Sequence, residues 1–183
     1  IGDRDILEAG RKAEEEDRLE VAITMYKRAG LHTNKPHMSR MFLACIHYKM
    51  GKFIQALDYL NWAVDSQDKI KHLSVFSKDD QFISLYNRAL VNFRLGNDDK
   101  GLLDIRAAIS MQPSHLKARE VLALALRRVT RYGESIEISK QNALMRKETL
   151  LQEEELQRQL LEKQKRRAQL SKERLLKRGI GSS

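Results

Sequence analysis

Histidine and cysteine are the side chains of this sequence that could hold a metal ion. The chain has five histidines and one cysteine, of which Cys45 and His47 are close neighbours. On a helix, residues two apart point about 200° away from each other, so these two side chains cannot share one ion. A single cysteine also supplies neither a cysteine-rich zinc site nor an internal disulfide. We therefore expect no bound metal, and a reducing compartment, with the cytoplasm as the default.

Patterns that carry catalysis are missing from the sequence. It contains no glycine-rich phosphate loop, no G-x-S-x-G elbow and no H-E-x-x-H pair. Its carboxylates are scattered along segments of helical spacing, and nothing in the pattern gathers them into a pocket. We expect that the chain is not an enzyme, needs no cofactor and functions by binding.

The composition favours long helices. Two prolines and nine glycines occur among 183 residues, of which 42% are hydrophobic and 32% are charged. So few turn-forming residues leave little room for a many-stranded sheet, and we predict an all-α fold. The sequence contains no run of 18 uncharged apolar residues that would suggest a membrane span, and its first residues do not resemble a signal peptide. Because the chain begins with Ile1, we expect it to be part of a longer protein.

Four segments of the sequence align with one another. They begin at residues 17, 51, 96 and 130, which are 34, 45 and 34 residues apart, and they read DRLEVAITMYKRAG, GKFIQALDYLNWAV, GNDDKGLLDIRAAI and TRYGESIEISKQNA. A period of 34 residues is typical of helical hairpins that bury their apolar faces only by stacking. We explain the longer interval by an 11-residue insertion within about 65–82.

Particular residues of these units resemble the tetratricopeptide repeat family, over about residues 3–143. The family has a small residue in the first helix of each unit, and this sequence has Gly10, Ala44, Ala89 and Ala123. In the second helix the family has alanine, a large residue and alanine. The corresponding residues are Ala22, Tyr26, Ala29; Ala56, Leu60, Ala63; Gly101, Ile105, Ala108; and Ser135, Ser139, Asn142.

This resemblance implies a solenoid of four helical hairpins, at 3–36, 37–70, 82–115 and 116–149. Pro113 stands where the family has a proline after the second helix of a unit. More polar residues in the last unit suit a terminal repeat, which lacks a neighbour on one side. The alternative is a generic helical bundle without repeat geometry.

The sequence changes character after residue 143. Residues 144–178 contain no glycine or proline and consist almost only of strong helix formers. We predict one long helix of about 50 Å, at about 1.5 Å per residue, and a flexible end at 179–183. A strict heptad is missing, so a coiled coil is only an open alternative. Much of the net charge of +9 lies here, on Lys163, Lys165, Arg166, Arg167, Lys172, Arg174, Lys177 and Arg178.

The resemblance also implies a binding surface, because the stacked first helices of this family line a concave groove. The inward positions of the second unit are Met38, Met41, Phe42, Cys45 and Tyr48, and those of the third are Ile83, Tyr86, Asn87, Leu90 and Phe93. At its edge we expect Arg94, Lys117, Arg127 and Arg128. Methionines and aromatic residues suit an adaptable groove for an amphipathic helix. The alternative is that this stripe serves only internal packing.

Some tetratricopeptide proteins hold an acidic chaperone tail with a clamp of polar side chains, which makes a co-chaperone an alternative function. The sequence matches the clamp at Asn87 and Lys117, but Met41, Cys45 and Val121 replace its other polar residues. A carboxylate in this groove would therefore lack donors.

We expect a non-catalytic scaffold that binds other proteins within a large complex. The basic helix suits an acidic surface such as that of tubulin, which would place the chain on the cytoskeleton or in a cilium. It also needs no partner if it is merely solvated. Nucleic acid is a weaker alternative, because the tail has no aromatic residue on which bases could stack, and we expect no membrane partner.

Overall fold

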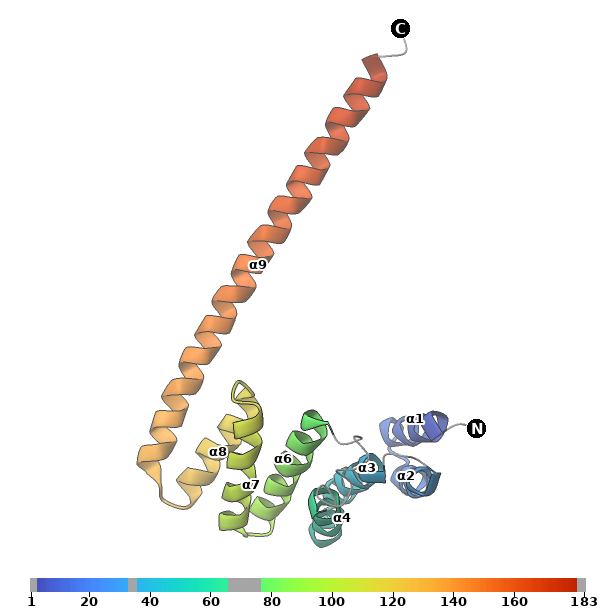
Figure 1. Cartoon of the computed structure of the whole chain (residues 1–183), viewed down its shortest axis with the longest axis vertical. Helices are drawn as coiled ribbons and strands as arrows, with labels where there is room; N and C mark the ends of the chain where they lie inside the picture. Colours follow the sequence, from blue (N-terminus) through green and yellow to red (C-terminus); the bar gives the residue numbers. More distant parts are fainter. Residues whose placement is uncertain (1–2, 33–35, 66–76, 181–183) are drawn as a thin grey trace. The chain divides into compact units, whose positions relative to one another are not determined.

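The computed structural model describes residues 3–32, 36–65 and 77–180 of the chain, and the side chains of 5–31, 36–65 and 77–170. All regular elements in these ranges are α-helices (Figure 1), which confirms the predicted all-α fold. They are α1 (Asp3–Glu15), α2 (Leu19–His32), α3 (Pro36–Lys49), α4 (Phe53–Asp65), α6 (Lys78–Arg94), α7 (Asp98–Met111), α8 (Leu116–Arg128) and α9 (Tyr132–Ile180). Residues 1–138 form one compact unit and residues 139–183 form another.

Consecutive helices of the first unit pack as hairpins: α1 against α2, α3 against α4, and α6 against α7. Gly51 and Gly96 make the turns after α3 and α6, with φ of 73° and 76°. Glycine adopts this left-handed conformation at no steric cost, as their place in the sequence predicted. The equivalent turns after α1 and α8 are made by Asp17 and Thr130, with φ of 57° and 62°.

The small residues of the repeat pattern lie buried where helices cross. Ala44, Ala89 and Ala123 of the first helices are all buried. So are the second-helix triplets, which are Ala22, Tyr26, Ala29; Ala56, Leu60, Ala63; and Gly101, Ile105, Ala108. Short side chains at these crossings allow the helices to approach closely enough to exclude water.

Two glycines in the pattern are fixed by aromatic rings on the partner helix of the hairpin. A Cβ atom at Gly101 would lie 2.5 Å from the Phe93 ring, and a Cβ atom at Gly10 would lie 2.5 Å from the Tyr26 ring. Even alanine would therefore collide. The departure of the third unit from alanine follows from the size of Phe93.

Helix α6 begins with a capping box. The N-cap is Ser77, whose Oγ accepts from the Asp80 amide at 3.1 Å. Asp80 completes the capping box by accepting from the Ser77 amide at 3.1 Å, so both residues satisfy end groups of the helix. Most of the predicted insertion within 65–82 falls on 66–76, outside the described residues.

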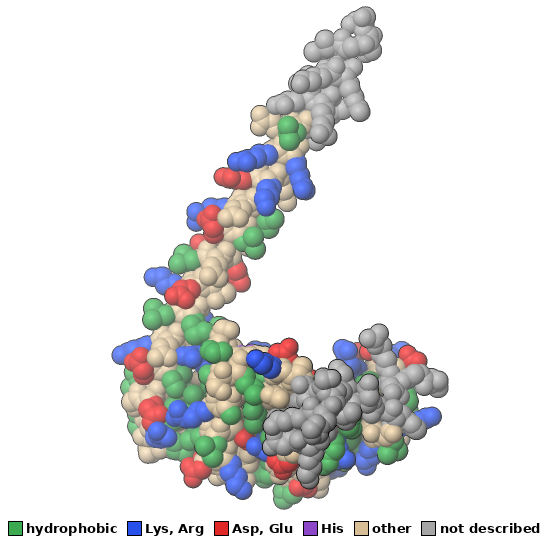
Figure 2. All heavy atoms as spheres, viewed as in Figure 1, with side chains coloured by type: hydrophobic (Ala, Val, Ile, Leu, Met, Phe, Trp, Pro, Cys, Tyr) green, Lys and Arg blue, Asp and Glu red, His purple; other side chains and the backbone are tan. Residues whose placement is uncertain are grey.

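The last helix is continuous where the sequence suggested a boundary. α9 runs from Tyr132 to Ile180 without a break at 143 and 144. It includes the first two residues of the predicted flexible end, 179–183, and the other three lie outside the described residues. From 146 to 170 every side chain is exposed, and charged side chains of both signs alternate with hydrophobic ones (Figure 2). No helix in the described ranges is long and apolar enough to span a membrane.

Candidate functional site

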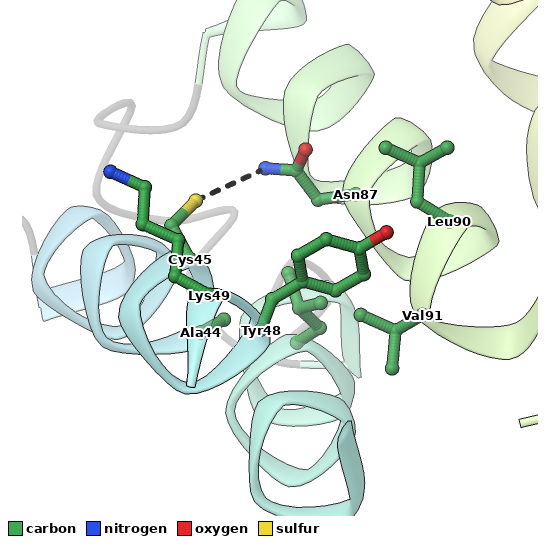
Figure 3. A pocket seen from close by; sticks show the side chains of 8 residues that line it. Ala44, Cys45, Tyr48, Lys49, Asn87, Leu90 and Val91 are labelled. Atoms are coloured by element: carbon green, nitrogen blue, oxygen red, sulfur yellow. Dashed lines mark hydrogen bonds between the residues drawn. The ribbon is translucent and has the colours of Figure 1, made fainter. Parts of the chain in front are cut away.

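Helices α3 and α6 border a hollow of about 280 Å³ (Figure 3). These are the first helices of the second and third hairpins, and the floor between them includes Leu60 of α4. The walls are mainly apolar. The lining residues are Ala44, Cys45, Tyr48, Lys49, Leu60, Asn87, Leu90 and Val91. A hollow of this size and character accepts one large apolar side chain more readily than a charged one.

The polar groups of this hollow are weakly engaged or lie at its rim. The Asn87 amide reaches toward the Cys45 sulfur, with Nδ2 donating to Sγ at 3.8 Å (Figure 3), and sulfur is a weak acceptor. Burial raises the pKa of the Cys45 thiol, so this group is held in its neutral form. Lys49 forms an ion pair with Glu14 of α1. The inner wall therefore carries no free charge among the described side chains.

A second hollow, of about 300 Å³, lies between α6 and α8. It shares Tyr48 and Leu90 with the first, so the two adjoin. The residues that line it are Tyr48, Leu90, Phe93, Arg94, Val121, Leu124, Ala125 and Arg128. We call these two hollows, with their lining residues, the groove.

Two arginines of the groove are held in place by its aromatic residues. Arg94 Nε donates to the Tyr48 hydroxyl at 2.9 Å, and its guanidinium lies 6.0 Å from the Tyr48 ring centre. Arg128 Nη1 donates to the Phe93 carbonyl oxygen at 2.9 Å, with its guanidinium 5.6 Å from that ring centre. Arg128 also forms an ion pair with Asp98. The basic groups thus lie at the edge of an aromatic floor.

Four residues predicted for the groove make packing contacts and line neither hollow. Met41 is buried, and its sulfur accepts from the Ser84 hydroxyl at 3.1 Å. Phe42 stacks on Tyr26 of α2 at 4.9 Å between ring centres. Tyr86 stacks on Phe82 and contacts His115, with centre distances of 5.9 and 5.8 Å. Arg127 Nε donates to Ser135 Oγ at 3.1 Å, which directs it toward α9.

Three further predicted residues, Met38, Ile83 and Lys117, line neither hollow. In the basic helix, Lys163, Lys165, Arg166 and Arg167 are exposed, and the side chains of Lys172, Arg174, Lys177 and Arg178 lie outside those described. The prediction missed Leu124, which is 67% exposed and lines the second hollow. A signal for it existed, because Leu124 follows Ala123 as Leu90 follows Ala89.

The groove offers apolar surface and guanidinium donors. Among the described residues, no group of three or more His, Cys, Asp or Glu side chains is placed to hold a metal ion. His47, which the sequence set beside Cys45, stacks on Tyr59 of α4 at 5.4 Å between ring centres. This arrangement suits recognition of another molecule.

Comparison with known proteins identifies the fold. No family model and no curated protein sequence matches the chain. A crystal structure of MamA is 18% identical, covers 81% of this chain and 80% of its own, and has a TM-score of 0.66. A tetratricopeptide repeat protein from Parabacteroides merdae ATCC 43184 is 19% identical over 74% of this chain and 50% of its own, with a TM-score of 0.61.

A third similar structure contains a bound peptide. It is the first tetratricopeptide domain of Spaghetti (RPAP3) with the HSP90 peptide SRMEEVD, 16% identical over 70% of this chain and 93% of its own, with a TM-score of 0.59. These likenesses confirm a tetratricopeptide-type fold, as the spacing and the small residues predicted.

Proposed function

We propose that this chain is a non-catalytic scaffold that holds a helix or an extended segment of another protein in the groove. The observation that carries the proposal is the pair of adjoining hollows, of about 280 and 300 Å³. They share Tyr48 and Leu90, which project from α3 and α6, so one continuous apolar strip crosses the first helices of successive hairpins.

The exposure of Leu124 supports a partner on this surface. The side chain is 67% exposed and lies beside Val121 around the second hollow. Covering apolar surface releases roughly 25 cal/mol per Å², and contiguous exposed apolar patches mark interaction sites more often than isolated residues do. A bound segment would cover Leu124 and Leu90 together.

An acidic chaperone tail is a second candidate occupant, since one structure of the same fold holds the HSP90 peptide. The composition of the groove disfavours it. Met41 is buried, and Cys45 and Val121 present a thiol and an isopropyl group to the hollows. A terminal carboxylate there would lose water without gaining enough hydrogen-bond donors. We therefore rank a mainly apolar segment above such a tail.

The basic helix gives the scaffold a second contact. Lys163, Lys165, Arg166 and Arg167 are exposed on α9, and their charges attract acidic protein surfaces such as that of tubulin. Residence in the cytoplasm, on the cytoskeleton or in a cilium is part of this proposal. Attraction between exposed charges weakens with salt, since the Debye length is about 8 Å at physiological ionic strength.

The groove is tested by charge introduced on one leucine inside it and on one leucine outside it. Leu90 is half-buried in the groove, whereas Leu103 of α7 is 71% exposed and lies by another hollow with Leu57 of α4, so Leu103→Arg is the control for an added charge outside the groove. Proteins that co-purify with the full chain are quantified by mass spectrometry. We expect Leu90→Arg to lower recovery of groove partners at least about tenfold, with unchanged helicity by circular dichroism. Equal losses in both variants, or in neither, would contradict the proposal.

The basic helix is tested by neutralising charge within the full chain. One variant replaces Lys163, Lys165, Arg166 and Arg167 with glutamine. Its control replaces Glu148, Glu153, Glu154 and Glu155 with glutamine. We expect the first variant alone to lose the partners that are also lost on raising salt. Recovery of only RNA or DNA with the wild-type chain would favour the nucleic-acid alternative and reject the scaffold.

A further inference from the structure

The edge of the groove carries an unbalanced positive charge. Arg128 is paired with Asp98. For Arg94 the contacts within the described ranges are the hydrogen bond to Tyr48 and the position near its ring, and no carboxylate there pairs with it. Arg94, Arg128 and Asp98 together therefore leave a charge of about +1 beside the apolar floor.

Arg94 is arranged to receive a carboxylate. Its bond to Tyr48 uses Nε, one of the five N–H donors that a guanidinium offers. The side chain is exposed, and the terminal nitrogens of a guanidinium form a planar fork that matches carboxylate oxygens. Because Tyr48 already restrains the side chain, less rotamer freedom is lost when a ligand binds.

The first hollow selects a different kind of group. Its volume of about 280 Å³ is near the lower end of the roughly 300–1,000 Å³ usual for small-molecule pockets, which suits one large side chain. Ala44, Leu60 and Val91 form its inner wall, and Lys49 at the rim is paired with Glu14. A charged side chain inserted there would be desolvated without a partner.

We propose that the groove recognises a protein segment with one large aliphatic or aromatic side chain and a nearby acidic residue. The apolar side chain enters the hollow between α3 and α6, and the carboxylate meets Arg94 beside the second hollow. The inference rests on the proposed function and names the chemistry of its partner. It also separates this groove from a clamp for a terminal carboxylate, because the acidic group is internal to the segment and the anchor is apolar.

Selection from a library of random 16-residue displayed peptides tests the proposal on the full chain. We expect enriched peptides to share one Leu, Ile, Met, Phe or Trp and one Asp or Glu at a constant separation. With synthetic copies, replacing the anchor by alanine weakens binding at least about tenfold. Replacing Asp by Asn, or Glu by Gln, weakens it about threefold, as for a solvent-exposed ion pair.

A double-mutant comparison attributes the acidic preference to Arg94. In Arg94→Gln, the acidic and the neutral peptide should bind equally, whereas Lys100→Gln on α7, which makes the same change of charge, should keep the difference. Two outcomes would overturn this inference and leave the proposed function standing, provided that the enriched peptides lose binding to Leu90→Arg. In the first, the peptides show no preference for an acidic residue. In the second, they keep that preference in Arg94→Gln. Failure to enrich any peptide sensitive to Leu90→Arg would overturn both.

Discussion

The two compact units of this chain are helical for different physical reasons. In residues 1–138, side chains such as Leu126 and Ile105 are fully buried between helices. In the second unit, every side chain from 146 to 170 is exposed. There the helix relies on intrinsic propensity and on local pairs such as Gln159 with Glu155, at 3.4 Å, each worth about 0.2–0.5 kcal/mol. Packing fixes the first unit, whereas helix propensity and local pairs stabilise the exposed part of the second.

This difference bears on what each unit can recognise. The first unit holds a formed groove, whose arginines are restrained by Tyr48 and Phe93. The second offers charge along a helix whose side chains are exposed from 146 to 170, with local pairs such as Arg158 with Glu155, at 3.6 Å. We therefore expect shape selectivity from the groove and salt-sensitive, less selective attraction from the helix.

Matched leucine truncations should show the largest contrast. Leu126 is 0% exposed and Leu160 is 50% exposed. Leu126→Ala should destabilise the first unit by about 2–5 kcal/mol, because it leaves a cavity, whereas Leu160→Ala should change its stability by less than about 0.5 kcal/mol. Urea unfolding followed by fluorescence of Trp62, the single tryptophan, measures both. Similar losses of unfolding free energy in the two variants would show that packing does not distinguish the units.

A proline in the exposed helix should affect only its own unit. Gln159→Pro removes a backbone donor and collides with the preceding turn, at a cost of about 3 kcal/mol to the helix. We expect a lower circular dichroism signal at 222 nm and an unchanged Trp62 unfolding midpoint, with Gln159→Ala as the control. A shifted midpoint would mean that the stability of the first unit depends on the helix around residue 159.

Glycine substitutions test how tightly the first unit is packed. Gly101→Ala would place Cβ 2.5 Å from the Phe93 ring, whereas a Cβ at Gly133 meets nothing within 4 Å. Gly101→Ala should cost about 1–3 kcal/mol by overpacking, and Gly133→Ala should stabilise by up to about 1 kcal/mol. Thermal denaturation measures the difference. Adding Phe93→Leu should recover part of the loss at Gly101, and no recovery would reject the steric explanation.

Thiol reactivity should separate the two units by a smaller margin. Burial raises the pKa of Cys45, so at pH 8 less of it is the reactive thiolate, and its rate should keep rising to higher pH than that of an exposed thiol. We expect iodoacetamide to modify Cys45 at least about tenfold more slowly than a cysteine at position 159, introduced as Gln159→Cys with Cys45→Ala. Equal rates would show that the hollow does not shield the sulfur.

The sequence predicted the hairpin spacing because glycine turns and small crossing residues leave a local signature. It could not explain why the third unit has glycine at position 101 where the family has alanine, because the reason is the Phe93 ring across the hairpin. The burial of Met41 could not be predicted either, because Met41 packs against Ser84, which lies 43 positions along the chain. Position within a repeat indicates the face of a helix, but the sizes of the facing side chains decide which residues stay open to a partner.

The groove itself is tested most directly by a photo-reactive benzoylphenylalanine placed in the full chain at Leu124, with position 103 as the control. The two leucines are 67% and 71% exposed, on α8 and α7, so accessibility to chance encounters is matched. We predict cross-links from position 124 that map to one segment of a partner protein and that disappear in Leu90→Arg. Equal cross-linking from both positions, or cross-links from 124 that survive Leu90→Arg, would contradict the account.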